Sequence, residues 1–411
     1  MNGKRRLKMK QLTRLFIPIC LETLFYMLSG MVDTLMLSAV GDYAVGAVGT
    51  ANSYIGIFII MFSIISSGMV SVMTQNIGAG RPGVAYQARQ LGLLFNAVAG
   101  VLMAAFLFSG AGAILRMVGI ADALYEPALI YLKIVGGGCI LNAVIPIFSS
   151  YLRAFGYTKQ PLYATIVGNI ANFVMNAVFL FVLHKGVAGV ATATVISKIL
   201  NLCIGLYFSH KLISAKNSTE RIANKTVLGQ IVKVGLPSAC ETALYNVAMM
   251  LVIRFLNQMD AEGLNVTARS YTATISNFSY CVGAALAQAN AIMTGWHIGA
   301  GELEECDRGT KRAAFVGVCV AVCMETAIVL GSGFIMPLFT DNPEMTALVR
   351  KLLAIDIVLE IGRVTNLVFG QALKTSGDAV FPAVIAAVFM FVFAVGGTWL
   401  FGISMGLMAV G

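Results

Sequence analysis

The chain has 411 residues, of which 58% are hydrophobic and only 11% are charged, whereas a soluble globular domain carries roughly 25% charged residues. Its mean hydropathy is +0.84, so a soluble fold of this size would lack the polar side chains needed to cover its surface. The formal net charge of +9 is no nucleic-acid signature here, because the basic residues crowd the N-terminus and alternate loops, where they set membrane orientation. We therefore expect an integral membrane protein with no nucleic-acid partner.

Continuous apolar runs follow one another along the chain, each long enough for an α-helix to cross roughly 30 Å of hydrocarbon. They exclude an outer-membrane barrel, whose strands alternate apolar and polar residues over short segments. The predicted spans lie at 14–39, 44–73, 89–113, 124–149, 161–183, 186–209, 230–258, 265–294, 312–336, 346–372 and 380–402. A twelfth apolar stretch starts near Ile403 and stops at Gly411. We expect an all-α polytopic bundle of twelve helices, with the last helix largely missing from this sequence.

The start of the chain carries six basic residues: Lys4, Arg5, Arg6, Lys8, Lys10 and Arg14. A basic start before an apolar run resembles a signal peptide, but the run continues past Glu22 to about Ala39 with no small-residue cleavage site, which predicts an uncleaved first helix. Alternate loops, such as 74–89 and 210–233, are also rich in Lys and Arg. By the positive-inside rule we place the protein in the cell membrane with a cytoplasmic N-terminus.

The two halves of the chain repeat each other. Three pairs of segments match at offsets of 219 to 221 residues: IPICLETLFY (17–26) with GLPSACETALY (235–245), NIGAG (76–80) with HIGAG (297–301), and LRAFGYTKQP (152–161) with LKTSGDAVFP (373–382). Six spans precede the repeat, so it predicts two six-helix lobes related by a pseudo-twofold. We assign 1–209 to the N-lobe, 210–228 to a cytoplasmic linker and 229–411 to the C-lobe.

Pro18 and Pro237 occupy equivalent positions inside the first helix of each lobe. Each frees a carbonyl and permits a bend. Bends at matching points suit a rocking motion, although proline kinks also occur in static bundles. Both residues are hinge candidates.

Ionisable side chains within the spans are functional candidates, since burying one costs several kcal/mol unless it is paired or protonated. In the N-lobe they are Glu22 and Asp33, eleven residues apart on the first span, and therefore on roughly one side of the helix. Such a pair could bind a cation or exchange protons; alternatively, Asp33 near the helix end contacts headgroups or water. Polar residues on the fifth and sixth spans either line the same site or only join helices. They are Asn169, Asn172 and Asn176, which are spaced three and four residues apart, and Thr192 and Thr194.

The C-lobe candidates are Glu241, Arg254, Glu325, Asp356, Glu360 and Arg363. Glu241 stands at the repeat position of the first-span glutamate. Glu360 and Arg363 are spaced i, i+3 and can pair on one helix face, either as a structural pair or as a substrate contact. Arg254 and Asp356 fall nearer the predicted helix ends, where we expect them to snorkel.

Several chemistries are excluded by what the sequence lacks. No GxxxxGK[ST] phosphate loop is present, so this chain does not hydrolyse ATP. The eight cysteines form no CxxC pair or metal-ligand spacing, and the three histidines stand in loops or at helix ends. We expect neither an enzyme nor a resident metal or cofactor; a coupling ion, Na⁺ or H⁺, is the only ion we anticipate.

A set of motifs in order along essentially the whole chain resembles the multidrug and toxic compound extrusion (MATE) transporters. They are VDTLMLSAVGDYAVGAVGTA (32–51), QNIGAG (75–80), LRAFGYTKQP (152–161), GVAGVATATVIS (186–197), GLPSACE (235–241), HIGAG (297–301) and LKTSGD (373–378). The resemblance implies two six-helix lobes around a cleft that opens alternately to either side. It also implies export of organic, often cationic, compounds in exchange for Na⁺ or H⁺.

The resemblance also assigns residues in the N-lobe. Asp33 falls on the functional first-helix aspartate of the archaeal and DinF-like branch, and Asn172 and Thr194 fall on the asparagine and threonine of its cation site. Asn176 is a departure, since that branch has an aspartate there, and the loss of a carboxylate weakens a Na⁺ site.

The C-lobe matches the family less well. The NorM-like glutamate aligns near Tyr245 and the NorM-like aspartate near Arg363, with Glu241 and Glu360 close by as substitutes. The identity of the coupling ion therefore stays open.

We accordingly expect a monomeric, cation-coupled exporter of small organic compounds that works by alternating access. Asp33 and Glu22 would couple ion or proton binding to the N-lobe, with Asn172, Asn176 and Thr194 as oxygen ligands or hydrogen-bond partners. The polar centre of the C-lobe would comprise Glu241, Glu360, Arg363 and Tyr245. Besides substrate, membrane lipid is the only partner expected.

Two other function classes remain open. A flippase for a lipid-linked oligosaccharide or cell-wall precursor, which related folds perform, should have a basic cleft for pyrophosphate. Here the membrane charges are mostly acidic, with Arg363 as the main central cation. A channel or structural membrane protein is the third class; channels commonly assemble by symmetry around a pore, whereas this chain supplies its own pseudo-twofold.

Overall fold

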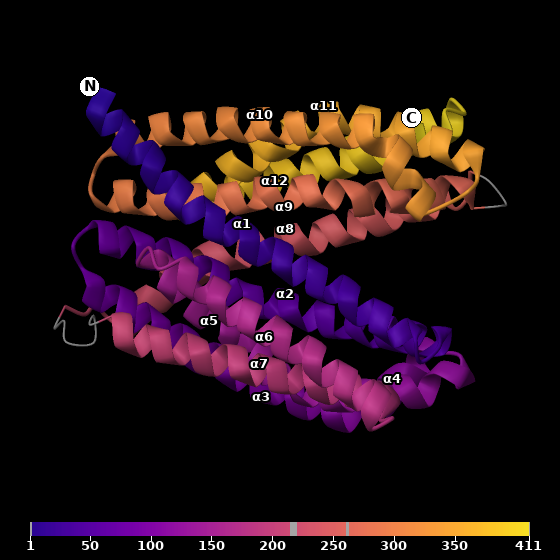
Figure 1. The fold of residues 1–411 in the computed structure, drawn as a ribbon. Coiled ribbons are helices and arrows are strands. Elements are labelled where there is room, and N and C mark those ends of the chain that lie inside the picture. Colours follow the sequence, from indigo (N-terminus) through magenta and orange to yellow (C-terminus); the bar gives the residue numbers. More distant parts are fainter. Residues whose placement is uncertain (1, 214–219, 260–262, 411) are drawn as a thin grey trace. The chain divides into compact units, whose positions relative to one another are not determined.

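The N-terminal half consists of long helices joined by short turns. The computed structural model describes residues 2–213, 220–259 and 263–410. The first six helices are α1 (Asn2–Ser38), α2 (Asp42–Gly78), α3 (Pro82–Val118), α4 (Asp122–Gly137), α5 (Cys139–Ala154) and α6 (Lys159–Ala177). A π-helical turn, Val178–Val182, extends α6, and α7 (Gly186–Leu212) follows. Within this half, α3 packs against α2, α4 and α5, while α1 and α7 pack against α6 (Figure 1).

The C-terminal half repeats this construction. Its helices are α8 (Asn224–Leu256), α9 (Leu264–Gly299), α10 (Leu303–Ile335), α11 (Pro343–Ser376) and α12 (Val380–Phe389). The helix α12 continues as π-helical segments, Met390–Val395 and Thr398–Ser404, before a short turn at Met408–Val410. Both α10 and α11 pack against α9 and against each other. The described residues thus form helices and turns with no strand, as the sequence predicts.

Each predicted span coincides with observed helix, but the fourth span is not continuous. The predicted helix at 124–149 is instead two helices, α4 and α5, bent by 43° at Gly138. Three consecutive glycines, Gly136–Gly138, stand at the break, and glycine runs are a usual cause of sharp kinks. Gly136 packs against Leu107 of α3, so that a Cβ there would lie 3.0 Å from the Leu107 side chain. The expectation of one unbroken helix was therefore wrong.

The helices have the length and exposure expected in a membrane. Among the described residues, eight helices are long and apolar enough to cross it, and nine spans result if α4 and α5 count as one. The long helices α9 and α11 are outside this set; α11 carries Asp356, Glu360 and Arg363 in its middle. Large apolar side chains such as Phe334, 88% exposed, point outward, as lipid-facing residues do.

The chain divides into two compact units, Met1–Gly235 and Leu236–Gly411, with the boundary inside α8. These units are called the N-lobe and C-lobe below. Of the linker expected at 210–228, residues 214–219 lie outside the described residues; α7 extends to Leu212 and α8 begins at Asn224.

A proline lies inside the first helix of the N-lobe and frees one backbone carbonyl. Pro18 lies inside α1 and cannot bond the carbonyl of Arg14, one turn earlier. The hydroxyl of Thr158, just before α6, donates to that carbonyl at 3.4 Å. The carbonyl that the proline frees is therefore satisfied by another helix of the same lobe.

Glycines bring the helices of the C-lobe close together. A Cβ on Gly317 of α10 would lie 2.7 Å from Leu286 of α9 and 2.8 Å from Val364 of α11. Small residues at such crossings let helix backbones approach in a membrane.

We predict that Gly317→Ala lowers the melting temperature of the purified protein in detergent, because overpacking a helix crossing costs about 1–3 kcal/mol. Gly309→Ala, on the same helix with no atom within 4 Å of its Cβ, is the matched control and should leave the melting temperature unchanged or raise it. Equal melting temperatures for the two variants would contradict the packing argument.

Candidate functional site

The N-lobe holds a polar cluster between α1 and α6. The side-chain amide of Asn176 donates to Oδ1 of Asp33 at 2.7 Å and to Oδ1 of Asn172 at 3.1 Å. Both asparagines are buried, and Asn176 is 0% exposed. The spacing of four residues places Asn172 and Asn176 one above the other on α6. The structure thus brings together three of the predicted N-lobe residues.

Residues from three further helices border this cluster. Tyr131 of α4 lies near Asn52 of α2 and Thr194 of α7, and it is close enough to Asp33 to interact with its charge. The hydroxyl of Thr194 donates to the carbonyl of Val190 in its own helix at 2.9 Å. Thr194 therefore borders the cluster, with its hydroxyl bonded within its own helix.

A lysine that sequence reasoning missed completes the cluster. Nζ of Lys198, on α7, donates to Oδ1 of Asn142, on α5, at 2.8 Å. Its charge also interacts with that of Asp33. The expectation that Arg363 is the main central cation therefore left out a basic side chain inside the N-lobe. One signal was available: Lys198 stands one turn after Thr194, inside an apolar run.

Glu22 has a different partner from Asp33. Its Oε1 lies 2.7 Å from a guanidinium nitrogen of Arg153, at the end of α5, and both side chains are largely buried. The first helix therefore carries two separate polar positions. One is an ion pair near Pro18, and the other is the Asp33 cluster three turns further on.

The same ion pair occurs in the C-lobe. Oε2 of Glu241, on α8, lies 2.8 Å from Nζ of Lys374, on α11. Glu241 and Lys374 follow Glu22 and Arg153 by 219 and 221 residues, which are the offsets of the internal repeat. Both partners of the pair are thus repeated. Tyr245, one turn after Glu241, is 47% exposed.

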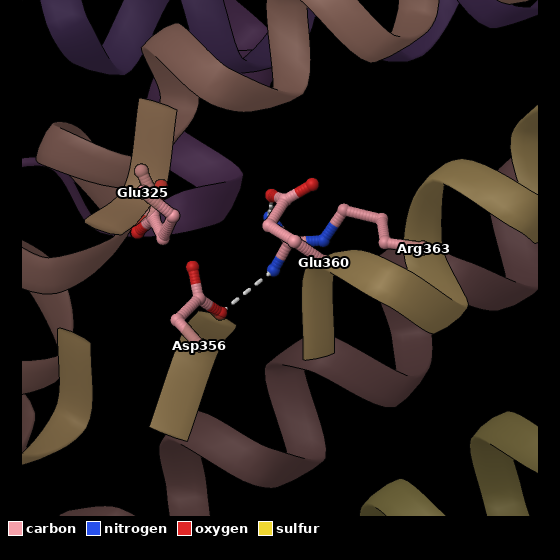
Figure 2. Close-up of polar contacts among 5 residues, drawn as sticks. Glu325, Asp356, Glu360 and Arg363 are labelled. Carbon is pink, nitrogen blue, oxygen red and sulfur yellow. Dashed lines mark hydrogen bonds and ion pairs between the residues drawn. The ribbon is translucent and has the colours of Figure 1, made fainter. Parts of the chain in front are cut away.

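The middle of the C-lobe contains a second charged cluster, drawn in Figure 2. Arg363 pairs with Glu360, one turn earlier on α11, as their spacing predicts, and with Oδ1 of Asp356 at 3.1 Å. Glu325 of α10 accepts a hydrogen bond from Ser276 of α9 at 2.8 Å. The expectation that Asp356 snorkels was wrong: it is 8% exposed, because its helix packs against α9 and α10.

The cluster is acidic and incompletely bonded. Glu325 and Glu360 are both 0% exposed. One carboxylate oxygen of each of Glu325, Asp356 and Glu360 is buried without a hydrogen-bond partner in the described part of the chain. Three carboxylates face one guanidinium, so the four side chains carry two excess negative charges when all are ionised. An apolar lobe cannot keep such an excess without bound protons or cations.

Few other arrangements in the described residues suggest chemistry. No group of three His, Cys, Asp or Glu side chains there is placed to hold a metal ion. The eight cysteines are free thiols. The candidate site therefore consists of two buried polar clusters, one around Asp33 in the N-lobe and one around Glu360 in the C-lobe.

A multi-pass membrane protein of two repeated helical lobes is the class that this architecture defines. The MatE family model matches residues 18–178 and 237–400, one segment in each half, and the chain therefore belongs to this family of membrane transporters. The chain is 33% identical over 395 residues to the uncharacterized transporter YisQ of Bacillus subtilis, covering 95% of this chain and 86% of that one.

More distant proteins share the fold. The probable multidrug resistance protein NorM of Thermotoga maritima is 21% identical over 389 residues, with 92% of this chain and 82% of the relative covered. The outward-facing structure of a multidrug resistance MATE family transporter superimposes with a TM-score of 0.84 at 20% identity, over 98% of this chain and 91% of that chain. A MATE structure in the bent conformation gives a TM-score of 0.85 at 20% identity, over 98% and 90%.

We predict that Glu241→Gln lowers the melting temperature, because it leaves the Lys374 ammonium, whose side chain is 15% exposed, without a carboxylate. Losing one partner of a buried pair costs about 3–5 kcal/mol, and the residual exposure favours the lower end. The double variant Glu241→Gln/Lys374→Gln should recover part of the loss, since neither charge then remains.

The control is Asp307→Asn, which breaks the ion pair of Asp307 with Lys311, where both side chains are more than 60% exposed. Exposed pairs contribute little to stability, so this variant should melt as the wild type does. A double variant no more stable than Glu241→Gln alone would argue against the buried pair.

Proposed function

We propose that this chain is a cation-coupled exporter of organic, mostly cationic, compounds that works by alternating access. The observation that carries the proposal is the C-lobe cluster, in which Glu325, Asp356 and Glu360 outnumber Arg363. Its partnerless buried oxygens are acceptors for whatever positive species enters the lobe. The names of the multidrug resistance relatives support this substrate class.

The excess charge supplies a mechanism for exchange. Ionised carboxylates in an apolar lobe attract either an organic cation or a coupling cation, H⁺ or Na⁺. The two then compete for one pool of negative charge, so loading the coupling ion on one side of the membrane releases the substrate there. A ligand can bias the conformational equilibrium only through such differential binding.

The N-lobe residues have a matching role in the proposal. Asp33 is the carboxylate that responds to the coupling ion, with Asn172, Asn176 and Thr194 as its hydrogen-bond network. Structural changes there would reach α1, which carries Asp33 and contains Pro18.

The two repeated ion pairs complete this picture. Glu22 and Glu241 hold the first helix of each lobe through Arg153 and Lys374. The prolines at positions 18 and 237, one turn before each glutamate, then let that helix bend during transport. We place the protein in the cell membrane with its N-terminus in the cytoplasm. The flippase alternative is not favoured, because the centre of the C-lobe is acidic.

Transport is tested in inverted membrane vesicles under imposed gradients, with a panel of cationic dyes added to the outside medium. We expect dye uptake to be driven by an acidic lumen or by a Na⁺-rich lumen, and to collapse with the ionophore that dissipates that gradient. Asp33→Asn should lower uptake at least tenfold without changing the amount of protein in the membrane. Uptake and ion dependence equal to those of the wild type would remove Asp33 from the mechanism.

Glu325 offers a sharper test of the C-lobe. Glu325→Gln keeps the oxygen that accepts from Ser276 but can carry neither negative charge nor a proton, so we expect gradient-driven uptake to fall at least tenfold at unchanged melting temperature. Ser276→Ala is the matched control, since it removes the hydrogen bond and keeps the carboxylate; it should retain most of the uptake. If the two variants lose uptake equally, the charge of Glu325 is not what matters.

A further inference from the structure

The start of α8 belongs to the N-lobe, although the internal repeat makes α8 the first helix of the C-lobe. The boundary between the two compact units falls after Gly235, so the first three turns of α8 lie within the N-lobe unit. Val227 and Ile231 of these turns are 0% exposed, and they share an apolar cluster with Met69 of α2. Together with the two residues before the helix, these turns are called the junction segment (222–235) below.

Two glycines bring the junction segment into direct contact with the backbone of α2. A Cβ on Gly68 of α2 would overlap the backbone oxygen of Ile231. A Cβ on Gly235 would overlap the backbone oxygen of Ile64, also on α2. The two helices therefore touch backbone to backbone at two points, as small residues allow in a membrane. The segment is thus packed as an integral helix of the N-lobe.

A buried glutamine of α3 fixes the chain at the other end of the junction segment. Nε2 of Gln87 donates to the carbonyl oxygen of Ile222 at 2.7 Å, and its Oε1 accepts from the amide nitrogen of the same residue at 3.2 Å. The same Nε2 also donates to Oδ1 of Asn224, the first residue of α8. Gln87 is 4% exposed, so moving the segment away would leave a buried amide without these partners, which is costly.

We propose that the junction segment stays docked on the N-lobe throughout transport, with Gln87 as its positioning residue, and that the lobes move about Leu236 and Pro237. Pro237 has no N–H to donate to the carbonyl of Lys233, one turn earlier, so α8 is weakest immediately after the docked turns. The pivot then lies inside a helix and not in the chain that precedes it. The inference rests on the proposed function only for the movement of the lobes; the docking of the segment does not depend on it.

The docking is tested by limited trypsin digestion of the purified full-length chain in detergent, which requires no transport. Trypsin cuts after Arg221 and Lys225, whose exposed side chains lie on either side of the Gln87 contacts. We expect Gln87→Ala to raise the rate of cleavage at these sites about fivefold or more, because the segment then opens more often. Gln90→Ala, which alters an exposed glutamine of the same helix, is the matched control and should leave the rate unchanged.

Equal cleavage rates for these two variants would overturn the docking. Asn224→Ala removes one of the three hydrogen bonds and replaces Gln87→Ala in the comparison if that variant does not fold.

Cross-linking tests whether the docking persists during transport. The double variant Gln87→Cys/Asn224→Cys is treated with a bis-methanethiosulfonate reagent, which reduction reverses, and each single cysteine variant is treated in the same way as a control. We expect the cross-linked double variant to keep at least half of the dye uptake that it shows before treatment, because the segment does not have to leave α3. A reversible loss of uptake that the single variants lack would show that the segment undocks during the cycle.

The position of the pivot is tested by Pro237→Ala, which restores the hydrogen bond to the carbonyl of Lys233 and stiffens α8. We expect dye uptake to fall about fivefold or more, while cleavage after Arg221 and Lys225 stays at the wild-type rate. Wild-type uptake in Pro237→Ala would show that the lobes do not move about this point. If the wild type itself takes up no dye, the export proposal fails, and the trypsin digestion still decides whether the segment is docked.

Discussion

A charge inside an apolar helix bundle must be balanced where it lies, because removing it from water costs several kcal/mol even after the protein relaxes. In this chain two buried ion pairs that meet that requirement also join helices that are distant in sequence. They are Glu22 of α1 with Arg153 of α5, and Glu241 of α8 with Lys374 of α11. Arg363 is instead paired with Asp356 and Glu360 of its own helix, α11. Apolar packing alone gives helices in lipid little preference for one neighbour over another. Buried charge therefore contributes specificity to the assembly of each lobe.

The duplication has preserved one of these interactions and not the others. The glutamate one turn after the proline, and the basic residue that binds it, occur in both lobes at the offset of the repeat. Thr158, which satisfies the carbonyl freed by Pro18, has Ala379 at its repeat position, and alanine has no hydroxyl to donate. Likewise, the N-lobe core holds one carboxylate and one lysine, whereas the C-lobe cluster holds three carboxylates and one guanidinium. The two lobes therefore share the ion pair that holds their first helix, and they differ in the charged side chains at their centres.

The sequence predicted the helices well because a membrane span is a local property of about 20 residues. It could not predict the break at Gly138, since a glycine run bends only when neighbours such as Leu107 pack into it. The spacing of Glu360 and Arg363 revealed their pair because both lie on one helix. The partners of Glu22 and Glu241 lie on other helices, and helical periodicity reveals only contacts within one helix. Both partners do lie in segments that the internal repeat matches. Asp356 was misjudged for the same reason: depth along a helix does not determine which helices cover it.

Lys198 shows why charge balance has to be counted lobe by lobe. Lys198 barely changes the mean hydropathy of the apolar run 186–209 in which it stands. When such a lysine is overlooked, the excess of acidic groups within the spans is assigned to the whole chain. In the structure three carboxylates and one guanidinium lie together in the C-lobe, whereas the N-lobe cluster has one carboxylate, Asp33, and the single lysine Lys198 on a neighbouring helix. In the proposed transport cycle a coupling cation is attracted to uncompensated charge, and in the C-lobe that charge lies on Glu325, Glu360 and Asp356. In the N-lobe it lies on Asp33, whose hydrogen bond from Asn176 connects it to Asn172.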